Sequence, residues 1–395
     1  MSKINDLIKE MCPNGVECKL LKDVSEMKRG QSITTKNLNE GNFPVIAGGQ
    51  EPSFYNDKYN REGETITVSS SGAYAGFLNY WNEPILCTDS FTIKSKKLNM
   101  RYLFHYLKMI QNEIYNKKKG AGIPHVHISD LEKIKIPCPP LEVQEEVVRI
   151  LDKFGELEAE LEAELEARKS QYEFWRGKVF DTKGKTKTYK LEEVLESLKT
   201  GLNPRKFFRL NTEDADGYYV TVREIGDRNV RYWESKDRVN KDGLLRINER
   251  ANLEIGDVLF SGTGTIGRVS LIEETPDNWN VKEGVYILKP KKEIINPIYL
   301  MHLMRSDYMK KLYSDYIVGS PVSSVPMRDL KNVKFELPDL DTQEKISNIL
   351  DKFDRLVNDI TVGLPAEIEL RRKQYEYYRN KLLDFEEIDH EFIAE

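Results

Sequence analysis

The sequence predicts an α+β fold in which two mixed α/β domains are separated by two long coiled-coil helical segments. Residues 139–154 recur as residues 338–353, with nine of sixteen positions identical. Both copies continue with apolar residues at three-and-four spacing, the pattern of long helices. The remaining stretches contain short β-rich runs between Gly, Asn and Pro. A repeat of this length indicates two similar structural units in one chain.

Length and charge agree with this division. The chain has 395 residues, which is enough for two domains that each bury a core. Its net charge of −5 is uneven, because residues 141–180 carry −5 and residues 339–395 carry −7. Residues 1–140 carry +4 and residues 181–338 carry +3. The domain-forming stretches are therefore mildly basic, which permits DNA binding but indicates it only weakly.

Several classes of protein are excluded by simple patterns. No apolar run approaches about 18 residues, so a membrane span is not expected. The N-terminal residues form an amphipathic helix rather than a signal peptide. The cysteines Cys12, Cys18, Cys87 and Cys138 lack CxxC spacing and indicate neither a zinc site nor a disulfide framework. These features predict a cytoplasmic protein.

Four segments are expected along the chain. They are a first domain at residues 1–138 with a helix at 3–12, a central helical segment at 139–183, a second domain at 184–337 and a C-terminal helical segment at 338–395. Residues 144–180 contain no proline and predict one helix about 60 Å long. Gly-Leu-Pro at 363–365 divides the C-terminal copy, because Gly ends helices and Pro begins them.

The domains themselves show mixed structure. Strands are predicted at residues 65–68, 91–94, 258–261 and 285–289, and helical stretches at 101–115 and 297–313. The two copies differ far more here than in the helical segments. This contrast indicates that the two similar helical segments form a constant frame, which holds two different domains.

A tetrapeptide repeat, Leu-Glu-Ala-Glu, places Leu157, Leu161 and Leu165 on one face of the central helix. Its many acidic residues would repel phosphates, so this helix is expected to be a spacer or a protein-docking surface. The residues expected to pack the helices and to dock partners are Leu151, Phe154, Leu157, Leu161, Leu165, Tyr172, Trp175, Ile349, Leu350, Phe353, Leu356, Tyr375 and Tyr378.

Motifs that resemble catalytic or cofactor sites have simpler interpretations. Gly262 to Gly267 match GxGxxG, but a second strand follows where a dinucleotide site needs a helix, which favours a β-hairpin. Asn296 begins an Asn-Pro-Ile-Tyr sequence that is better explained as a helix cap. His125 and His127 lack the companions of a metal site. The chain is therefore expected to be non-catalytic and to bind no metal or cofactor itself.

Polar and basic loops flanked by glycine occur at parallel positions in both domains. Arg, Lys, Asn and Gln can read base edges, whereas Ser, Thr and Lys suit phosphates. The candidate DNA contacts of the first domain are Lys28, Arg29, Gln31, Thr34, Lys36, Ser71, Tyr74, Lys117, Lys118 and Lys119. Those of the second domain are Lys199, Asn203, Arg205, Lys206, Arg223, Arg228, Arg231, Thr263, Thr265, Arg268, Ser320, Ser323 and Ser324.

Together these features resemble the specificity subunits of type I restriction–modification systems. The resemblance covers essentially the whole chain and rests on the alternation of variable domains with helices, the Ile-Leu-Asp-Lys-Phe and Gln-Tyr-Glu motifs, and the tetrapeptides. It implies that each domain is a target-recognition domain that reads one half of a bipartite site in double-stranded DNA. The two helical segments would pack antiparallel with pseudo-two-fold symmetry and fix the distance between the halves.

The same resemblance implies partners. Two methyltransferase (modification) subunits would dock on the helices, and restriction/translocase subunits would join for cleavage. S-adenosylmethionine, ATP and Mg²⁺ would then bind to these partners. One departure is that the interval between the repeat copies grows from 199 to 203 residues, so strict two-fold symmetry of the frame is not expected.

The tetrapeptides suggest that helix length sets the gap between half-sites. Four residues add about 6 Å and about 40° to a helix. One base pair adds about 3.4 Å and about 34–36°, so the rotation favours one base pair per tetrapeptide. The main alternative is a coiled-coil protein scaffold without DNA sequence preference, which would show little salt dependence. An enzyme with two lobes and a sequence-tolerant nucleic-acid binder are further alternatives.

Overall fold

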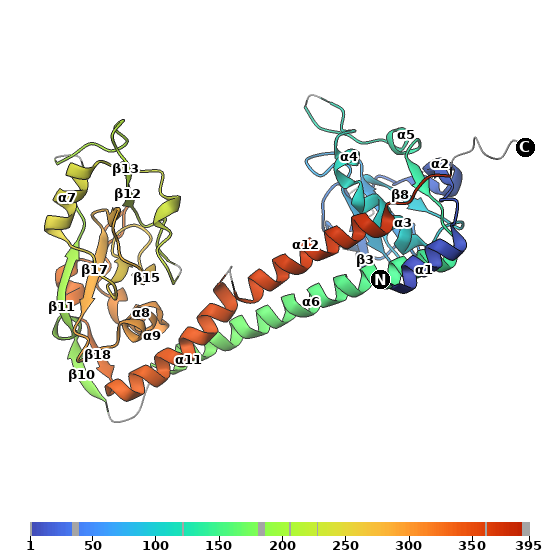
Figure 1. Cartoon of the computed structure of the whole chain (residues 1–395). Helices are drawn as coiled ribbons and strands as arrows, with labels where there is room; N and C mark the ends of the chain where they lie inside the picture. Colours follow the sequence, from blue (N-terminus) through green and yellow to red (C-terminus); the bar gives the residue numbers. More distant parts are fainter. Residues whose placement is uncertain are drawn as a thin grey trace, which may run out of the picture. The chain divides into compact units, whose positions relative to one another are not determined.

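The computed structural model describes residues 2–33, 39–120, 122–180, 186–204, 207–226, 228–359 and 362–388. The chain forms two compact units, of which the first comprises Met1–Glu160 with Ile368–Glu395 and the second Leu161–Glu367. Each unit therefore combines one globular domain with parts of the long helices (Figure 1).

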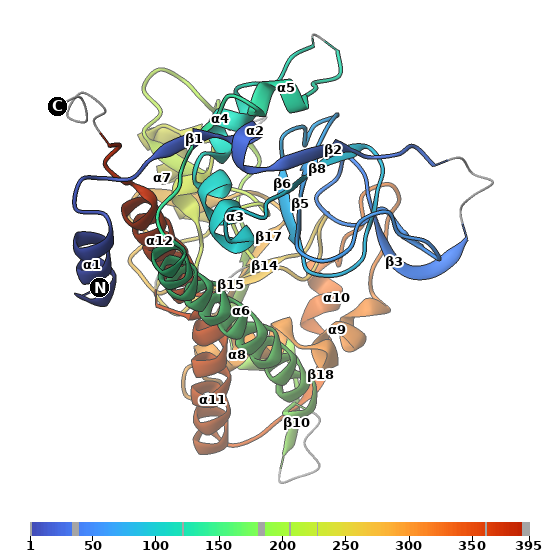
Figure 2. The ribbon, with the colours of Figure 1, turned by 90° about the vertical axis from the view of Figure 1, so that its right-hand side faces the viewer.

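The globular domain of the first unit is a mixed α+β structure. A four-stranded sheet has the order β2-β8-β5-β6, beside a three-stranded sheet β4-β3-β7 and the pair β1-β9. Helix α3 lies beside the large sheet (Figure 2), and Ile66 and Phe91 of the sheet share one core with Leu103 and Leu107 of α3. The elements are α1 (Ser2–Met11), β1 (Cys18–Leu20), α2 (Leu21–Val24), β2 (Glu26–Arg29), β3 (Glu40–Ile46), β4 (Tyr55–Asn56), β5 (Thr65–Ser69), β6 (Leu78–Trp81), β7 (Leu86–Cys87), β8 (Ser90–Lys94), α3 (Met100–Met109), α4 (Gln111–Tyr115), α5 (Ile128–Leu131) and β9 (Lys135–Pro137).

The globular domain of the second unit repeats this topology. Its four-stranded sheet has the order β11-β17-β14-β15, with a three-stranded sheet β13-β12-β16 and the pair β10-β18. Phe260 and Leu288 pack in one core with Leu300 and Leu303 of α8. The elements are β10 (Lys187–Lys190), η2 (Leu191–Val194), β11 (Leu195–Thr200), β12 (Gly217–Val220), η4 (Tyr232–Glu234), β13 (Arg238–Val239), α7 (Lys241–Arg250), β14 (Val258–Ser261), β15 (Val269–Leu271), β16 (Trp279–Val281), β17 (Val285–Pro290), α8 (Pro297–Arg305), α9 (Asp307–Ser314), α10 (Met327–Lys331) and β18 (Lys334–Leu337).

The predicted elements are confirmed with two refinements. Each of the four predicted strands lies within an observed strand, and the GxGxxG sequence is the turn between the antiparallel strands β14 and β15. The stretch 101–115 is divided at Ile110, whose backbone leaves the helical region. The stretch 297–313 is divided at Ser306, because its side chain caps α9 by accepting a hydrogen bond from the Met309 backbone N–H.

The long helices are also as predicted. Helix α6 (Leu141–Lys178) is continuous, whereas the C-terminal copy consists of α11 (Leu340–Asn358) and α12 (Leu364–Leu383). Gly363 is required between them, because a Cβ there would lie 2.5 Å from the Arg355 carbonyl oxygen. Within the first unit, Phe154 stacks on Tyr378 with ring centroids 5.4 Å apart, while four residues further along α6, Glu158 pairs with Arg372. The helices α6 and α12 are therefore antiparallel.

The described part of the chain holds no helix of the length and apolar character that a membrane span requires.

Candidate nucleic-acid interface

In the first unit, two predicted contact loops are joined by backbone hydrogen bonds. The Val126 N–H donates to the Ser70 carbonyl at 3.0 Å. Lys119 and His125 exchange two backbone hydrogen bonds of 2.9 and 2.8 Å, which close the loop that carries the lysines 117–119. Gly120 enables this closure, since its φ is +110° and a Cβ would lie 2.6 Å from a backbone oxygen. The serine loop and the lysine loop thus form one surface.

The second unit contains the same arrangement with different side chains. The Val325 N–H donates to the Gly262 carbonyl at 2.9 Å, and Val318 and Ser324 exchange two backbone hydrogen bonds of 2.8 Å. Gly319 has a φ of +101°, and a Cβ there would again lie 2.6 Å from a backbone oxygen. The loops 263–268 and 319–324 are therefore the counterparts of the two loops in the first unit. Each combination is called a loop pair below.

A third predicted loop joins the first loop pair. The Gln31 N–H donates to the Cys87 carbonyl at 3.0 Å, and the Ser70 N–H donates to the Asp89 carbonyl at 3.3 Å. The Ser71 hydroxyl also hydrogen-bonds the Asp89 carboxylate. The loop of Gln31 and the serine loop therefore meet at the turn between β7 and β8, and the serine loop connects both to the lysine loop.

The second loop pair is extended in a similar way. Thr200, which follows Lys199 at the end of β11, accepts a hydrogen bond of 3.0 Å from the Gly284 N–H. Gly284 in turn accepts one of 2.9 Å from the Gly262 N–H. Arg268 donates from Nη1 to the Val222 carbonyl at 3.0 Å, which connects the loop pair to the loop of Arg223.

Several predicted cations already have carboxylate neighbours on the surface. Lys28 pairs with Glu26 at 2.7 Å, Arg223 with Asp237 at 3.0 Å and Arg231 with Glu234 at 3.4 Å, while Lys119 pairs with Asp130. Exposed pairs of this kind stabilise a protein by only about 0–1 kcal/mol. A phosphate can therefore replace the carboxylate partner of Lys28, Arg223 or Arg231 at small cost. The Asp130 carboxylate is different, because it is 7% exposed and also accepts a hydrogen bond from the His127 N–H.

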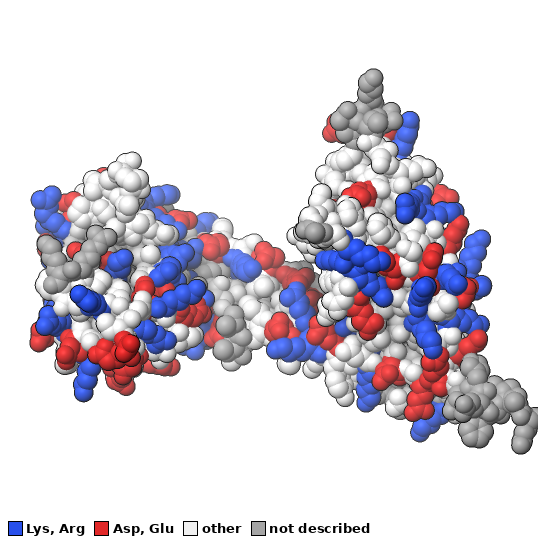
Figure 3. Space-filling view, turned by 90° about the horizontal axis from the view of Figure 1, so that it is seen from above, with Lys and Arg blue, Asp and Glu red and all other residues white. Residues whose placement is uncertain are grey.

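The other predicted contacts differ in exposure. Exposed residues are Arg29, Gln31, Tyr74, Lys199, Thr265, Arg268 and Ser320, and half-buried residues are Ser71, Lys117, Lys118, Asn203, Thr263, Ser323 and Ser324. Thr34, Lys36, Arg205 and Lys206 lie outside the described residues. Basic and acidic side chains are interspersed on the face of each unit drawn in Figure 3, so particular loops rather than bulk charge distinguish the candidate surface.

Arg228 requires a correction. Its side chain is 11% exposed, pairs with Glu273 at 2.6 Å and also contacts the Asp351 carboxylate of α11. A buried guanidinium that is bound by two carboxylates cannot present its donors to a phosphate. Arg228 therefore packs the globular domain against α11, and the structure does not support the predicted DNA contact at this position.

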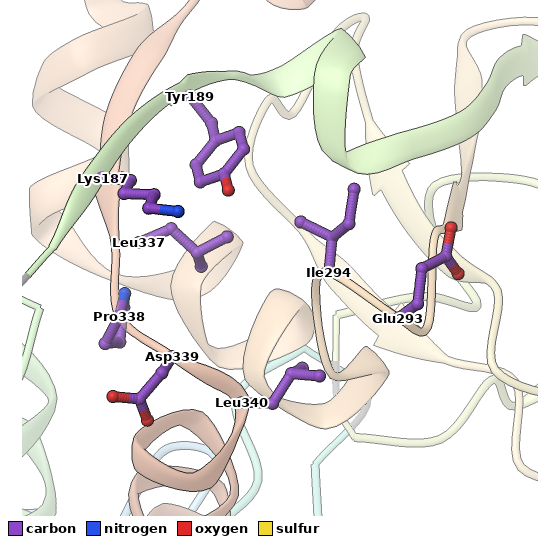
Figure 4. Close-up of a pocket in the computed structure, with 8 residues that line it drawn as sticks. All are labelled: Lys187, Tyr189, Glu293, Ile294, Leu337, Pro338, Asp339 and Leu340. Atoms are coloured by element: carbon purple, nitrogen blue, oxygen red, sulfur yellow. The ribbon is translucent and has the colours of Figure 1, made fainter.

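Two concave sites were not predicted from the sequence. A pocket of about 260 Å³ lies at the start of α11, where Leu337, Pro338, Asp339 and Leu340 face Tyr189 and Lys187 of β10 (Figure 4). A second pocket, of about 120 Å³, is lined by Trp233 and by Tyr232 and Trp279, whose rings stack with centroids 5.4 Å apart. Neither pocket includes a residue of the loop pairs.

The long helices bind each globular domain at the start of one helix. Gln144 of α6 accepts a hydrogen bond of 2.8 Å from the Asn99 N–H, directly before α3. Gln343 of α11 accepts one of 2.9 Å from the Asn296 N–H, directly before α8. Both asparagines cap their helices with their side chains, as the sequence predicted for Asn296.

A buried histidine follows two turns later in the first unit. His105 of α3 lies between the two long helices, with Nδ1 3.1 Å from the Tyr375 hydroxyl and Nε2 2.8 Å from Asp152 Oδ1. Burial by itself raises the pKa of Asp152, but hydrogen bonds from His105 and Arg101 outweigh this effect and hold the pKa at about 2. His105, Asp152 and Tyr375 are called the first junction.

The second unit has a corresponding group. Nδ1 of His302 in α8 lies 3.5 Å from the Tyr172 hydroxyl, and its Nε2 lies 4.0 Å from Asp351 Oδ1. Burial raises the pKa of Tyr172 to about 12, so its hydroxyl stays protonated and donates to Asp354 at 3.0 Å. His302, Tyr172, Asp351 and Asp354 are called the second junction.

The residues predicted to pack the helices fall into three groups. Leu151, Tyr172 and Leu350 are buried, and Phe154, Leu157, Leu161, Leu165, Phe353, Tyr375 and Tyr378 are half-buried. Trp175, Ile349 and Leu356 are 47%, 54% and 37% exposed, so these three do not pack the helices. They keep only the predicted docking role.

Comparison with known proteins agrees with these features. The family model described as the type I restriction modification DNA specificity domain matches residues 13–167 and 183–370. A putative type I restriction enzyme specificity subunit of Haemophilus influenzae is 31% identical over 364 residues, which cover 87% of this chain and 89% of that protein. The EcoR124I/EcoR124II specificity subunit of Escherichia coli is 27% identical over 368 residues, covering 84% and 88%.

Solved structures show the same fold. The S subunit of a type I system from M. genitalium matches with a TM-score of 0.59 and 18% identity, over 93% of this chain and 96% of that one. A chain from a study of complex assembly in a type I system matches with a TM-score of 0.60 and 16% identity, over 94% and 98%. Because the family model matches both halves, the chain belongs to the family of type I restriction–modification DNA specificity subunits.

Proposed function

We propose that each globular domain reads one half of a bipartite target in double-stranded DNA for a type I restriction–modification complex. Sequence-specific DNA recognition is the function of the family, and a specificity subunit performs no catalysis itself. The observation that supports two separate half-sites is the loop pair, which recurs in both units with the same backbone bonds and different side chains. Different side chains on one scaffold would recognise different base sequences.

The chemistry of the two loop pairs differs as this proposal requires. The first presents Lys117, Lys118 and Lys119 with Gln31, whereas the second presents Arg268 with threonines and serines. A glutamine can bond bidentately to adenine and an arginine to guanine, while lysine and hydroxyl groups suit phosphates. We therefore assign Gln31 and Arg268 to base contacts.

We also propose that two methyltransferase subunits dock on the long helices and that restriction/translocase subunits join them in the cytoplasm. Large apolar residues are exposed at matching positions, with Phe174 of α6 52% and Tyr377 of α12 61% exposed. Exposed aromatic residues on helices are typical of protein interfaces. Two matching exposed positions support the docking of two copies of one partner. S-adenosylmethionine, ATP and Mg²⁺ would bind to the partner subunits.

The test is selection of bound fragments from a random duplex pool, with the chain co-purified with its methyltransferase partner. We expect two short, unlike half-motifs at a fixed gap. Arg268→Ala should then relax the sequence of one half-motif and leave the other unchanged, whereas Lys381→Ala, an exposed substitution on α12, should change neither. Recovery of fragments without any motif would contradict the proposal and favour a scaffold.

A further inference from the structure

The two junctions occupy corresponding places in both units. Each histidine lies two turns into the helix that follows the capping asparagine, and is buried, with His105 4% and His302 0% exposed. Each ring faces a tyrosine hydroxyl from one long helix and an aspartate from the other. In the first unit, α3 accordingly lies against both α6 and α12 (Figure 2).

The junction residues also correspond in sequence. Asp152 and Asp351 are the aspartates of the two Ile-Leu-Asp-Lys-Phe motifs, and Tyr172 and Tyr375 are the tyrosines of the two Gln-Tyr-Glu motifs. The aspartate and the tyrosine of each copy therefore face the buried histidine of a globular domain, whereas other shared polar residues, such as Lys153 and Lys352, are exposed.

The physical role of these contacts differs from that of the surrounding core. Apolar packing is non-directional, so it holds a domain against a helix without fixing one angle. Hydrogen bonds weaken steeply when they are misaligned, and a buried polar group without a partner is costly. In the first unit, His105 is hydrogen-bonded to both long helices. In the second unit, His302 lies 3.5 Å from the Tyr172 hydroxyl and 4.0 Å from Asp351 Oδ1, and Arg305 of α8 pairs with Asp354 at 3.2 Å. Together with the glutamine bond at the start of α3 or α8, these directional contacts favour one orientation of the domain.

We propose that His105 and His302 are positioning residues that hold each recognition domain at one angle on the long helices and thereby set the gap between half-sites that the complex accepts. This inference rests on the proposed function. The histidines contact no DNA in this scheme, so they affect the accepted gap and leave the bases read within each half-site unchanged.

The test uses hydroxyl deletions that preserve shape. Tyr375→Phe removes the hydrogen bond to His105, and Tyr172→Phe removes the hydrogen bond to Asp354 and the 3.5 Å contact with His302. Tyr102→Phe is the matched control, because this buried tyrosine donates to the Pro137 carbonyl at 3.0 Å within the globular domain. For each complex with its methyltransferase, selection from duplex pools gives the half-motifs and the gap distribution separately, and thermal unfolding gives stability.

We expect unchanged half-motifs in all variants. Discrimination against gaps one base pair longer or shorter should fall about tenfold in the two junction variants, the factor that corresponds to one hydrogen bond. The control should lose similar stability and keep its gap discrimination. His105→Leu should reduce the discrimination between gap lengths further. His105→Gln, which keeps an amide in place of the ring, should restore part of this discrimination.

If the junction variants lose stability as the control does and keep the wild-type gap discrimination, the junctions only stabilise the fold and the inference is wrong. If the wild-type complex itself selects no motif, the proposed function fails, and the inference fails with it. These two results are distinct, because the second appears before any substitution is made.

Discussion

Replacing Arg228 by leucine tests the assignment of this residue to packing. Arg228 donates to Glu273 from Nη2 at 2.6 Å and Nε at 3.2 Å, and it also contacts Asp351. Removing one partner of a buried ion pair costs about 3–5 kcal/mol. In the Arg228→Leu variant, Arg355 still pairs with Asp351 at 3.2 Å and lies 3.7 Å from Glu273. We therefore expect the free energy of unfolding to fall by an amount near the lower limit, about 3 kcal/mol.

The assay is thermal unfolding. For a unit of this size, about 3 kcal/mol lowers the midpoint by about 6–12 °C. Arg355→Leu is the matched control, because Arg355 binds the same carboxylates but is 52% exposed, which limits the expected loss to about 1 kcal/mol. Equal midpoints for the two variants would refute the packing role. If Arg228→Leu instead lowered the salt slope of DNA binding by about one and left the unfolding midpoint unchanged, the original prediction that Arg228 contacts DNA would be supported.

Three further predictions follow from the same structure. Lys199→Ala should weaken DNA binding almost equally for all sequences and lower the salt slope by about 1, and an unchanged slope would remove Lys199 from the phosphate contacts. Burial lowers the pKa of His302 from 6.5 to about 3, so the unfolded chain takes up a proton first as the pH falls. Stability should therefore decrease by about 1.4 kcal/mol per pH unit as the pH falls from 6.5 towards 3, and His302→Gln should flatten this dependence in denaturant titrations at several pH values. Deleting residues 158–161 shortens α6 by about 6 Å and turns its end by about 40°. The selected gap should then shorten by one base pair, and an unchanged gap would contradict the proposed role of helix length.

The elements were predictable because their signals are local. Three-and-four spacing identified α6 and α11, and the Gly-Leu-Pro sequence located the break before α12. The second strand after the GxGxxG sequence identified a hairpin for the same reason. The compact units were less predictable, because the contacts of α6 with two different cores depend on residues that are distant in sequence.

The candidate site was predictable as a set of loops and less so as single residues. Arg223 and Arg228 lie in one polar loop, and nothing in that segment distinguishes them. Their difference comes from partners brought in by the fold, since Arg228 meets Glu273 of another loop and Asp351 of α11, whereas Arg223 stays exposed. A local pattern cannot show which of two arginines will be buried.

The sequence contains a signal for the two junctions that apolar spacing alone does not detect. Within the helix repeat, some apolar positions exchange, as Val147 and Ile346 do, and others, such as Leu151 and Leu350, are identical, while the glutamine, aspartate and tyrosine are identical in both copies. Apolar packing accepts such exchanges at small cost, but a hydrogen bond to a fixed partner requires the same group in the same place. Identical polar residues on the inner face of a repeated helix therefore indicate a directional contact with the domain that the helix supports. The loop pairs need only their backbone bonds and glycines to keep their shape, and their side chains can differ between the two domains.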